Sequence, residues 1–148
     1  MNVLENMTEQ LEFESKLNNI NRIEKLIDEV CEKHAINEDY YGNMLIALTE
    51  AVNNAIVHGN KQDPSKHVFL SCETQQNEVL FTVKDEGFGF DYSCIPDPTK
   101  PENLDKLNGR GVFLMKNLAD EVIFEDNGTT VRLKFTFVIK YFISFRRC

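Results

Sequence analysis

The sequence contains no apolar run that approaches the roughly 20 residues needed to cross a membrane, so we expect no membrane span. Its amino terminus also lacks a basic segment followed by an apolar run, the pattern of a secretory signal peptide. The four cysteines form no Cys-x-x-Cys pair, and no neighbouring histidines complete a zinc-binding spacing. Scattered cysteines suit a reducing compartment, and we therefore expect a cytoplasmic protein.

Positive charge is scarce relative to negative charge. The chain has 16 lysines and arginines against 24 aspartates and glutamates, for a formal net charge of -8. Such a surface repels phosphate backbones, so we expect a protein or small-molecule partner and no nucleic acid, although solubility alone is a simpler reason for the charge. The length of 148 residues suits one core, and we expect a single domain over residues 1–148.

Hydrophobic periodicity predicts an alternation of strands and helices. The predicted strands cover residues 11–16, 67–73, 78–84, 121–125 and 129–138. The predicted helices cover residues 20–35, residues 38–58 and a third segment that opens at Gly109. Asn18-Asn19 and Asn37 are the expected amino-terminal caps of the first two helices. Residues 91–108 show no clear period and hold three of the four prolines, which predicts a functional lid or a disordered segment.

The helix predicted for residues 38–58 has two distinct stripes. Its apolar residues recur at about 100° per residue and form one face. Glu50, Asn54 and His58 recur every four residues and fall nearly opposite that face. Taken alone, this polar stripe is typical of a solvated helix surface.

Glycine is scarce, with only seven residues, and five of them fall in three loops of the second half of the chain. These five are Gly87, Gly89, Gly109, Gly111 and Gly128. Gly109-Arg110-Gly111 opens a predicted helix, and a helix amino terminus offers free N–H groups and partial positive charge to a phosphate. The usual phosphate loop is absent, and Leu114 replaces the last glycine of a dinucleotide-binding fingerprint.

Four motifs occur in a specific order along the chain. They are Glu50-Ala51-Val52-Asn53-Asn54-Ala55-Ile56-Val57-His58-Gly59, Asp85-x-Gly87-x-Gly89, Gly109-x-Gly111 and Gly128-Thr129-Thr130. In this order the chain resembles the ATP-binding domain of the GHKL family (the Bergerat fold), shared by gyrase B, heat-shock chaperones, histidine kinases and mismatch-repair proteins. The resemblance runs from about residue 11 to residue 135. Within the family the chain is most similar to anti-sigma factors that are serine/threonine protein kinases.

The resemblance implies a fold and a set of residue roles. The implied fold is α/β, a two-layer sandwich with a mixed, largely antiparallel sheet and helices on one face, as in histidine-kinase-like ATPases. Asn54 would coordinate the Mg²⁺ that bridges the phosphates of ATP. Glu50, one helical turn earlier, would act as general base on a substrate hydroxyl or on water. Asp85 would accept a hydrogen bond from the adenine amino group.

The resemblance also implies roles for residues whose backbone lies close to the nucleotide and for residues that bind its phosphates. Gly87 and Gly89 would let the backbone pass close to the adenine base. The segment Gly109, Arg110 and Gly111 would wrap the phosphates beneath the lid. Thr130 would reach the adenine side from its strand.

The same resemblance implies a function in partner switching. The protein would bind a sigma factor and phosphorylate a STAS-type anti-anti-sigma protein with Mg-ATP, as a homodimer formed through the first strand and first helix. One departure leaves an alternative open. The family's kinases often carry a basic residue just before the second glycine pair, where this chain has Lys106, Leu107 and Asn108, and Arg110 between the glycines could substitute for it. The alternative is a nucleotide-gated protein-binding regulator without significant kinase activity. An ATPase subunit of a larger assembly is less favoured, because no transducer domain is present.

Overall fold

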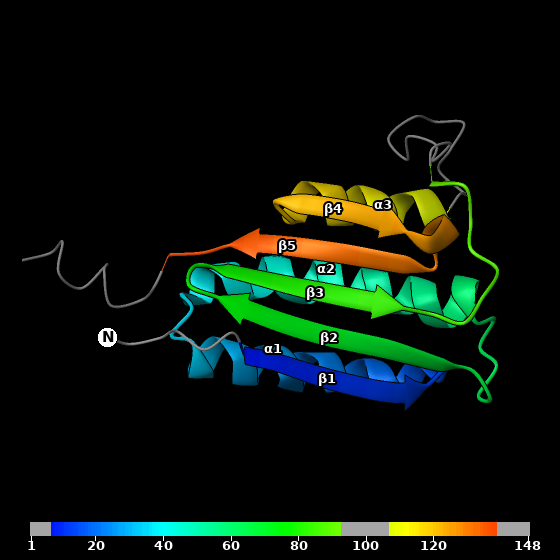
Figure 1. Ribbon diagram of the computed structural model, residues 1–148, viewed down its shortest axis with the longest axis horizontal. Helices are drawn as coiled ribbons and strands as arrows, with labels where there is room; N and C mark the ends of the chain where they lie inside the picture. The colour runs from blue at the N-terminus through cyan, green and yellow to red at the C-terminus, as the bar shows by residue number, and fades with distance from the viewer. Residues whose placement is uncertain (1–6, 93–106, 139–148) are drawn as a thin grey trace, which may run out of the picture.

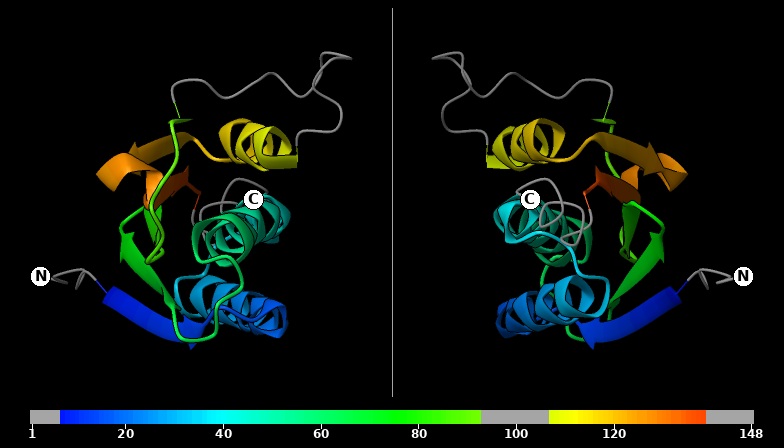
Figure 2. Two further views of the ribbon diagram at one scale, coloured as in Figure 1. Left: turned by 90° about the vertical axis from the view of Figure 1, so that its right-hand side faces the viewer. Right: turned by 90° about the vertical axis from the view of Figure 1, so that its left-hand side faces the viewer.

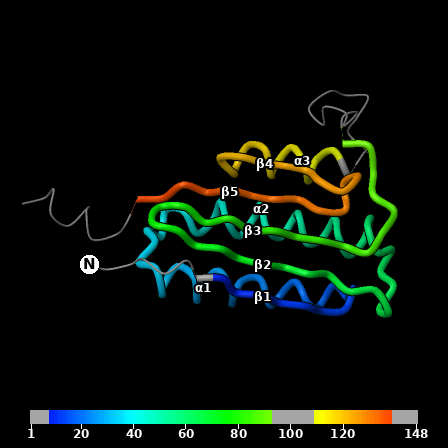
Figure 3. Tube along the Cα trace, viewed as in Figure 1, coloured from blue at the N-terminus to red at the C-terminus, as the bar shows by residue number. Residues whose placement is uncertain are grey.

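A five-stranded sheet forms one layer of the computed structural model, which describes residues 7–92 and 107–138 (Figure 1). The strands are β1 Met7–Glu14, β2 His67–Gln75, β3 Glu78–Lys84, β4 Glu121–Glu125 and β5 Thr130–Thr136. They lie side by side in the order β1-β2-β3-β5-β4, which the trace in Figure 3 follows. Each neighbouring pair in the described sheet is antiparallel.

Three helices form the second layer, and all of them cover the same face of the sheet (Figure 2). They are α1 Asn21–Lys33, α2 Tyr41–Asn54 and α3 Leu107–Leu118. The predicted α/β class, with two layers and helices on one face, is therefore confirmed. Within the described residues, no helix is long and apolar enough to cross a membrane.

The core lies between the two layers. Alternate residues of each strand point inward, because successive side chains of a strand lie on opposite faces of the sheet. Val68, Leu70 and Cys72 of β2 are buried in this way. Phe81 of β3 is fully buried and packs edge-on against Phe135 of β5, with ring centroids 6.0 Å apart. Burial raises the pKa of the Cys72 thiol to about 12, so this thiol remains protonated and unreactive at neutral pH.

The start of the first helix differs from the prediction. A 3₁₀ turn, Leu17–Ile20, precedes α1, and Ile20 occupies the cap position without a side-chain hydrogen bond. The Asn19 side chain instead donates to the Glu14 carbonyl oxygen at 2.8 Å, so the predicted Asn18-Asn19 cap is wrong. The local signal for a cap could not show that the end of β1 would compete for the same amide.

The predicted cap of the second helix is confirmed. The Asn37 side chain accepts a hydrogen bond from the Asp39 N–H at 3.0 Å. The chain then forms a 3₁₀ turn, Glu38–Tyr40, before α2 begins.

The far end of this helix departs from α geometry. Residues Ala55–Gly59 form a π-helical turn, and the Asn60 N–H donates to the carbonyl of Ala55, five residues earlier, at 2.8 Å. Such turns carry one extra residue and recur at functional sites. The predicted helix over residues 38–58 is therefore continuous in space but changes its winding where the cavity described below begins.

Candidate functional site

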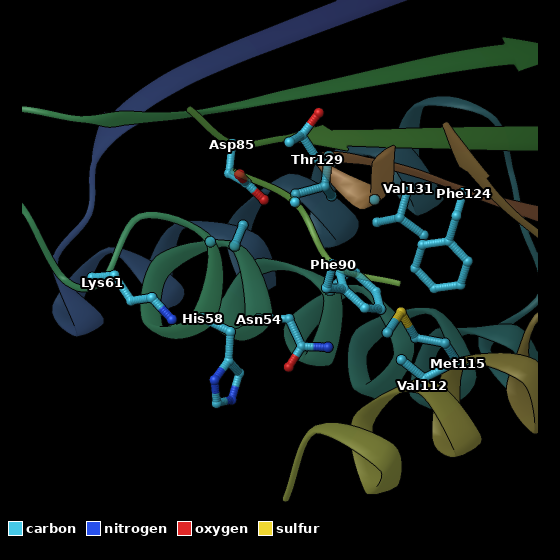
Figure 4. A pocket seen from close by; sticks show the side chains of 16 residues that line it. Asn54, His58, Lys61, Asp85, Phe90, Val112, Met115, Phe124, Thr129 and Val131 are labelled. Atoms are coloured by element: carbon cyan, nitrogen blue, oxygen red, sulfur yellow. The ribbon is translucent and has the colours of Figure 1, made fainter. Parts of the chain in front are cut away.

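A cavity of about 140 Å³ opens between the sheet and helices α2 and α3 (Figure 4). Its apolar wall consists of Val83, Phe90, Val112, Met115, Phe124 and Val131. Its polar lining includes Asn54, His58, Lys61, Asp85 and Thr129. An apolar recess with a few convergent polar groups is typical of a small-ligand site.

Asp85 brings a carboxyl group to this cavity from the end of β3. The residue is 9% exposed, and burial raises the pKa of its carboxyl group. Its Oδ1 accepts from the Gly87 N–H at 2.8 Å, and its own N–H donates to the Thr129 carbonyl at 2.9 Å. The carboxyl is therefore held in one orientation at the cavity wall.

Close backbone approach explains two glycines beside Asp85. A Cβ on Gly59 would overlap the Asp85 carboxyl group, and a Cβ on Gly87 would overlap the carbonyl oxygen of Gly59. Any side chain at either position would push the end of the π turn away from the end of β3. Glycine at these positions thus lets the two elements that flank the carboxyl group meet.

The amino-terminal part of α3 meets the polar stripe of α2 at Gly111, the fifth residue of the helix. A Cβ on buried Gly111 would lie 3.0 Å from Oε2 of Glu50 and 3.2 Å from Nδ2 of Asn54. Glu50 and Asn54 are both half-buried. In the same turn Gly109 is buried and Arg110 is exposed. The structure therefore brings together the residues that the sequence assigned to the phosphate end of the site.

The loops after β3 and before β5 are joined at the opposite side of the cavity. Gly89 has a φ of 83°, and a Cβ there would overlap the Asn127 carbonyl oxygen. The Phe90 N–H donates to that same oxygen at 2.8 Å. Gly128, with a φ of 87°, packs against Phe90, whose ring meets Phe124 edge-on at 5.5 Å. These contacts fix the aromatic part of the wall.

The structure does not bring Thr130 to this cavity. Its hydroxyl donates to Oδ2 of Asp126 at 3.2 Å, whereas Thr129 and Val131 line the cavity. Val131 is the next residue of β5, so its side chain points to the opposite side of the strand from that of Thr130. Thr129, which precedes Thr130, lines the cavity, and the adenine-side role of Thr130 stays a prediction.

His58 and Lys61, which line the cavity on its helical side, differ in charge. His58 lies in the π turn, and burial, with Lys61 nearby, lowers the pKa of its imidazole. This imidazole is therefore neutral at physiological pH, which leaves Lys61 as the cationic lining residue in the described part of the cavity.

Sequence reasoning missed Asn60, which follows the π turn. Its side chain is fully buried and makes hydrogen bonds to three separate segments. It also missed the apolar wall around Phe90 and Phe124, because only the tertiary fold brings those side chains together. The predicted lid over residues 91–108 lies mostly outside the described residues.

These features define a class of two-layer α/β ligand-binding domains. The features are a buried carboxyl group at the end of a central strand, a glycine-rich helix start and an apolar cavity. The chain belongs to the histidine kinase-like ATPase domain family, whose model matches residues 13–135. The GHKL resemblance inferred from the four motifs is thereby confirmed.

The chain is also similar to individual curated proteins. The chain is 44% identical to the anti-sigma F factor of Geobacillus thermodenitrificans over 94 residues, which covers 59% of this chain and 63% of that relative. It is 33% identical to the serine-protein kinase RsbW of Staphylococcus aureus over 96 residues, which covers 60% of each chain. The chain thus spans less than two thirds of the length of these curated relatives.

A solved structure shows the same fold. The RsbU and RsbW domains of a Mycobacterium tuberculosis protein match with a TM-score of 0.62 at 15% identity, covering 88% of this chain and 32% of that one. At this identity the likeness shows the fold alone.

Proposed function

We propose that this protein binds Mg-ATP in the cavity beside Asp85 and acts as an anti-sigma-factor-type serine/threonine protein kinase. Its substrate would be a STAS-type anti-anti-sigma protein, and its second partner a sigma factor. The observation that carries the proposal is the approach of Gly111 to Glu50 and Asn54. Gly111 directly follows the first turn of α3, so a carboxylate and an amide lie close to a helix amino terminus. The names of the relatives, an anti-sigma factor and a serine-protein kinase, support the choice of partners.

The adenine end of the proposed site is formed by Asp85. Its carboxylate would accept a hydrogen bond from the exocyclic amino group of adenine, a donor that guanine does not present at that position. The apolar wall, including Val131 and Met115, would cover the faces of the base and exclude water.

The phosphate end would lie where α3 starts against α2. The N–H groups of the first turn of α3 favour negative charge, and Arg110 is exposed in that turn. Asn54 offers an amide oxygen, a hard neutral donor that fits Mg²⁺ with its remaining shell of water and phosphate oxygen. When bound, Mg²⁺ would supply charge neutralisation for the transferred phosphoryl group. Glu50 would take the proton from the attacking hydroxyl group.

The test is transfer of the γ-phosphoryl group from Mg-ATP to a STAS-type protein of the same organism. Glu50→Gln should abolish labelling of the acceptor because it removes the base while keeping the side-chain shape. Glu73→Gln, an exposed change on β2, is the matched control and should leave labelling unchanged. Native transfer by Glu50→Gln would show that the base is assigned wrongly.

Leu107 favours a second candidate, a nucleotide-gated protein-binding regulator without significant kinase activity. It is the first residue of α3, at the position where related kinases often have a basic residue. In this case the native protein would bind ATP without labelling the acceptor, and its affinity for the sigma factor would differ between ATP, ADP and no nucleotide. Equal affinity in all three conditions would reject it.

We also propose a homodimer that acts in the cytoplasm. β1 lies at one edge of the described sheet, where its outer backbone groups remain available for pairing, and α1 packs behind the sheet nearby. Analytical ultracentrifugation at the protein concentration of the transfer assay should give the mass of a dimer. A monomer under those conditions would remove this part of the proposal.

A further inference from the structure

Asn60 connects three segments of the chain through one buried side chain. The residue is 0% exposed. Its Nδ2 donates to Oγ of Ser15 at 2.8 Å, at the end of β1, and to the carbonyl of His67 at 3.0 Å, at the start of β2. Its Oδ1 accepts from the backbone N–H of Glu86 at 2.8 Å. Every polar atom of this amide therefore has a partner.

The backbone of Asn60 is fixed as firmly as its side chain. Its N–H closes the π turn onto the Ala55 carbonyl at 2.8 Å, and its carbonyl accepts from the Asp63 N–H at 3.0 Å. The amide is therefore held at a defined place relative to Asn54, the last residue of α2, and to His58 in the π turn.

The bond to Glu86 is the one that reaches the ligand site. Glu86 directly follows Asp85, so this bond fixes the peptide on the carboxyl-terminal side of the buried carboxylate. On the other side of Asp85, its N–H is fixed to the Thr129 carbonyl. Gly59, the residue before Asn60, packs directly on the Asp85 carboxyl group. Two consecutive residues at the end of the π turn therefore hold Asp85 and Glu86 in place.

We propose that Asn60 is a positioning residue that sets the orientation of Asp85 for recognition of the purine 6-amino group. The inference rests on the proposed binding of ATP. Loss of the Oδ1 acceptor would free the Asp85–Glu86 peptide and leave a buried N–H without a partner. The carboxylate would then no longer be held where a 6-amino group can donate to it.

The bonds from Asn60 to Ser15 and His67 make it possible to distinguish the positioning of Asp85 by Asn60 from a contribution of Asn60 to stability alone. Ser15→Ala removes the bond that Asn60 donates to the Ser15 hydroxyl and the bond that this hydroxyl donates to the Lys66 carbonyl, but it leaves the bond between Asn60 and Glu86. Asn60→Asp retains an oxygen that can accept from Glu86 while removing both donated bonds. Both variants should therefore lower the melting temperature and keep the orientation of Asp85.

The experiment compares the affinities of ATP and purine riboside triphosphate, which lacks the 6-amino group, by isothermal titration calorimetry. The native protein should prefer ATP by at least about tenfold, the value of one hydrogen bond to a charged acceptor. Asn60→Ala should lose that preference through weaker ATP binding, with its affinity for the analogue unchanged. Ser15→Ala and Asn60→Asp should retain the preference. If Asn60→Ala does not fold, Asn60→Ser removes the same acceptor and leaves a polar group in the space.

The outcomes distinguish the inference from the proposed function. Equal weakening of both nucleotides in Asn60→Ala, or an unchanged preference, would overturn the positioning role while ATP binding stands. Absence of nucleotide binding by the folded native protein would overturn the proposed function, and the inference with it. Amide hydrogen exchange gives a second readout: the Glu86 N–H should lose protection in Asn60→Ala and keep it in Ser15→Ala. Protection of Glu86 in both variants would reject the inference.

Discussion

Replacing Gly111 by alanine separates the chemistry of the site from the stability of the fold. The added methyl would lie 3.0 Å from Oε2 of Glu50 and 3.2 Å from Nδ2 of Asn54. Ordinary contacts between such atoms lie at about 3.5 to 4.0 Å, so both side chains must move by a few tenths of an ångström. These atoms belong to the ends of flexible side chains, and the backbone need not move.

The expected magnitudes follow from this geometry. The fold should lose little, because alanine favours a helix over glycine by about 1 kcal/mol and this offsets the crowding. The rate of phosphoryl transfer should fall by about tenfold, because misplacement by a full ångström can cost about a hundredfold. Gly111→Ala should therefore combine a near-native free energy of unfolding with slow transfer.

Gly42→Ala is the matched control for this experiment. Gly42 lies in the first turn of α2, is exposed, and has no atom within 4 Å of where its Cβ would be. This variant should raise the free energy of unfolding by up to about 1 kcal/mol and leave transfer unchanged. The assays are urea denaturation and labelling of the STAS-type acceptor. Native transfer by Gly111→Ala would refute the argument that the positions of Glu50 and Asn54 set the rate.

Four further predictions follow from burial and backbone conformation. Asp85→Asn should abolish ATP binding in calorimetry and raise the melting temperature at neutral pH, because burial destabilises the charged form of this carboxyl; a lower melting temperature would contradict this. Because the folded-state pKa of Asp85 is raised, the folded state binds more protons than the unfolded state between the ordinary aspartate pKa of 3.8 and that raised pKa. The contribution of this group to the free energy of unfolding should therefore fall as pH rises through that window, whereas ATP affinity should fall as pH decreases through it; an affinity independent of pH there would reject the Asp85 assignment. Gly89→Ala should lower the free energy of unfolding by more than about 1 kcal/mol in urea denaturation, because its φ is 83° and a Cβ would overlap the Asn127 carbonyl; a loss of a few tenths would be inconsistent. Phe81→Ala should cost about 3 to 5 kcal/mol in the same assay, since the ring is fully buried, and a loss below about 1 kcal/mol would contradict the described core.

Local patterns in the sequence predicted the elements well, because each such pattern reports on neighbours along the chain. The strand predicted at residues 78–84 has the same bounds as β3, and the Asn37 cap is present. The first strand was placed at residues 11–16 but begins at Met7 and ends at Glu14, since its early residues pair with β2 without a clear apolar alternation.

The part of the site that could be predicted from the sequence is the part that the motifs contain. Glu50, Asn54 and Gly111 lie close together as the resemblance implied, although α2 and α3 are separated in the sequence by β2 and β3. The position of Thr130 depends on which side of the strand faces the cavity, which one residue of register decides. Asn60 carries no local signal, because all three partners of its side chain are distant in the sequence or in other elements.

The π turn at Ala55–Gly59 also determines where the fold can tolerate the insertion or deletion of a residue. A residue deleted there would restore regular α winding and rotate everything after it by about 100° around the helix axis. Asn60 would then point away from Glu86, and Gly59 away from Asp85. Deletions should therefore be rejected between Asn54 and Asn60, whereas the hairpin turn after Gln75 lies at the other end of β3 from Asp85 and should accept an inserted residue.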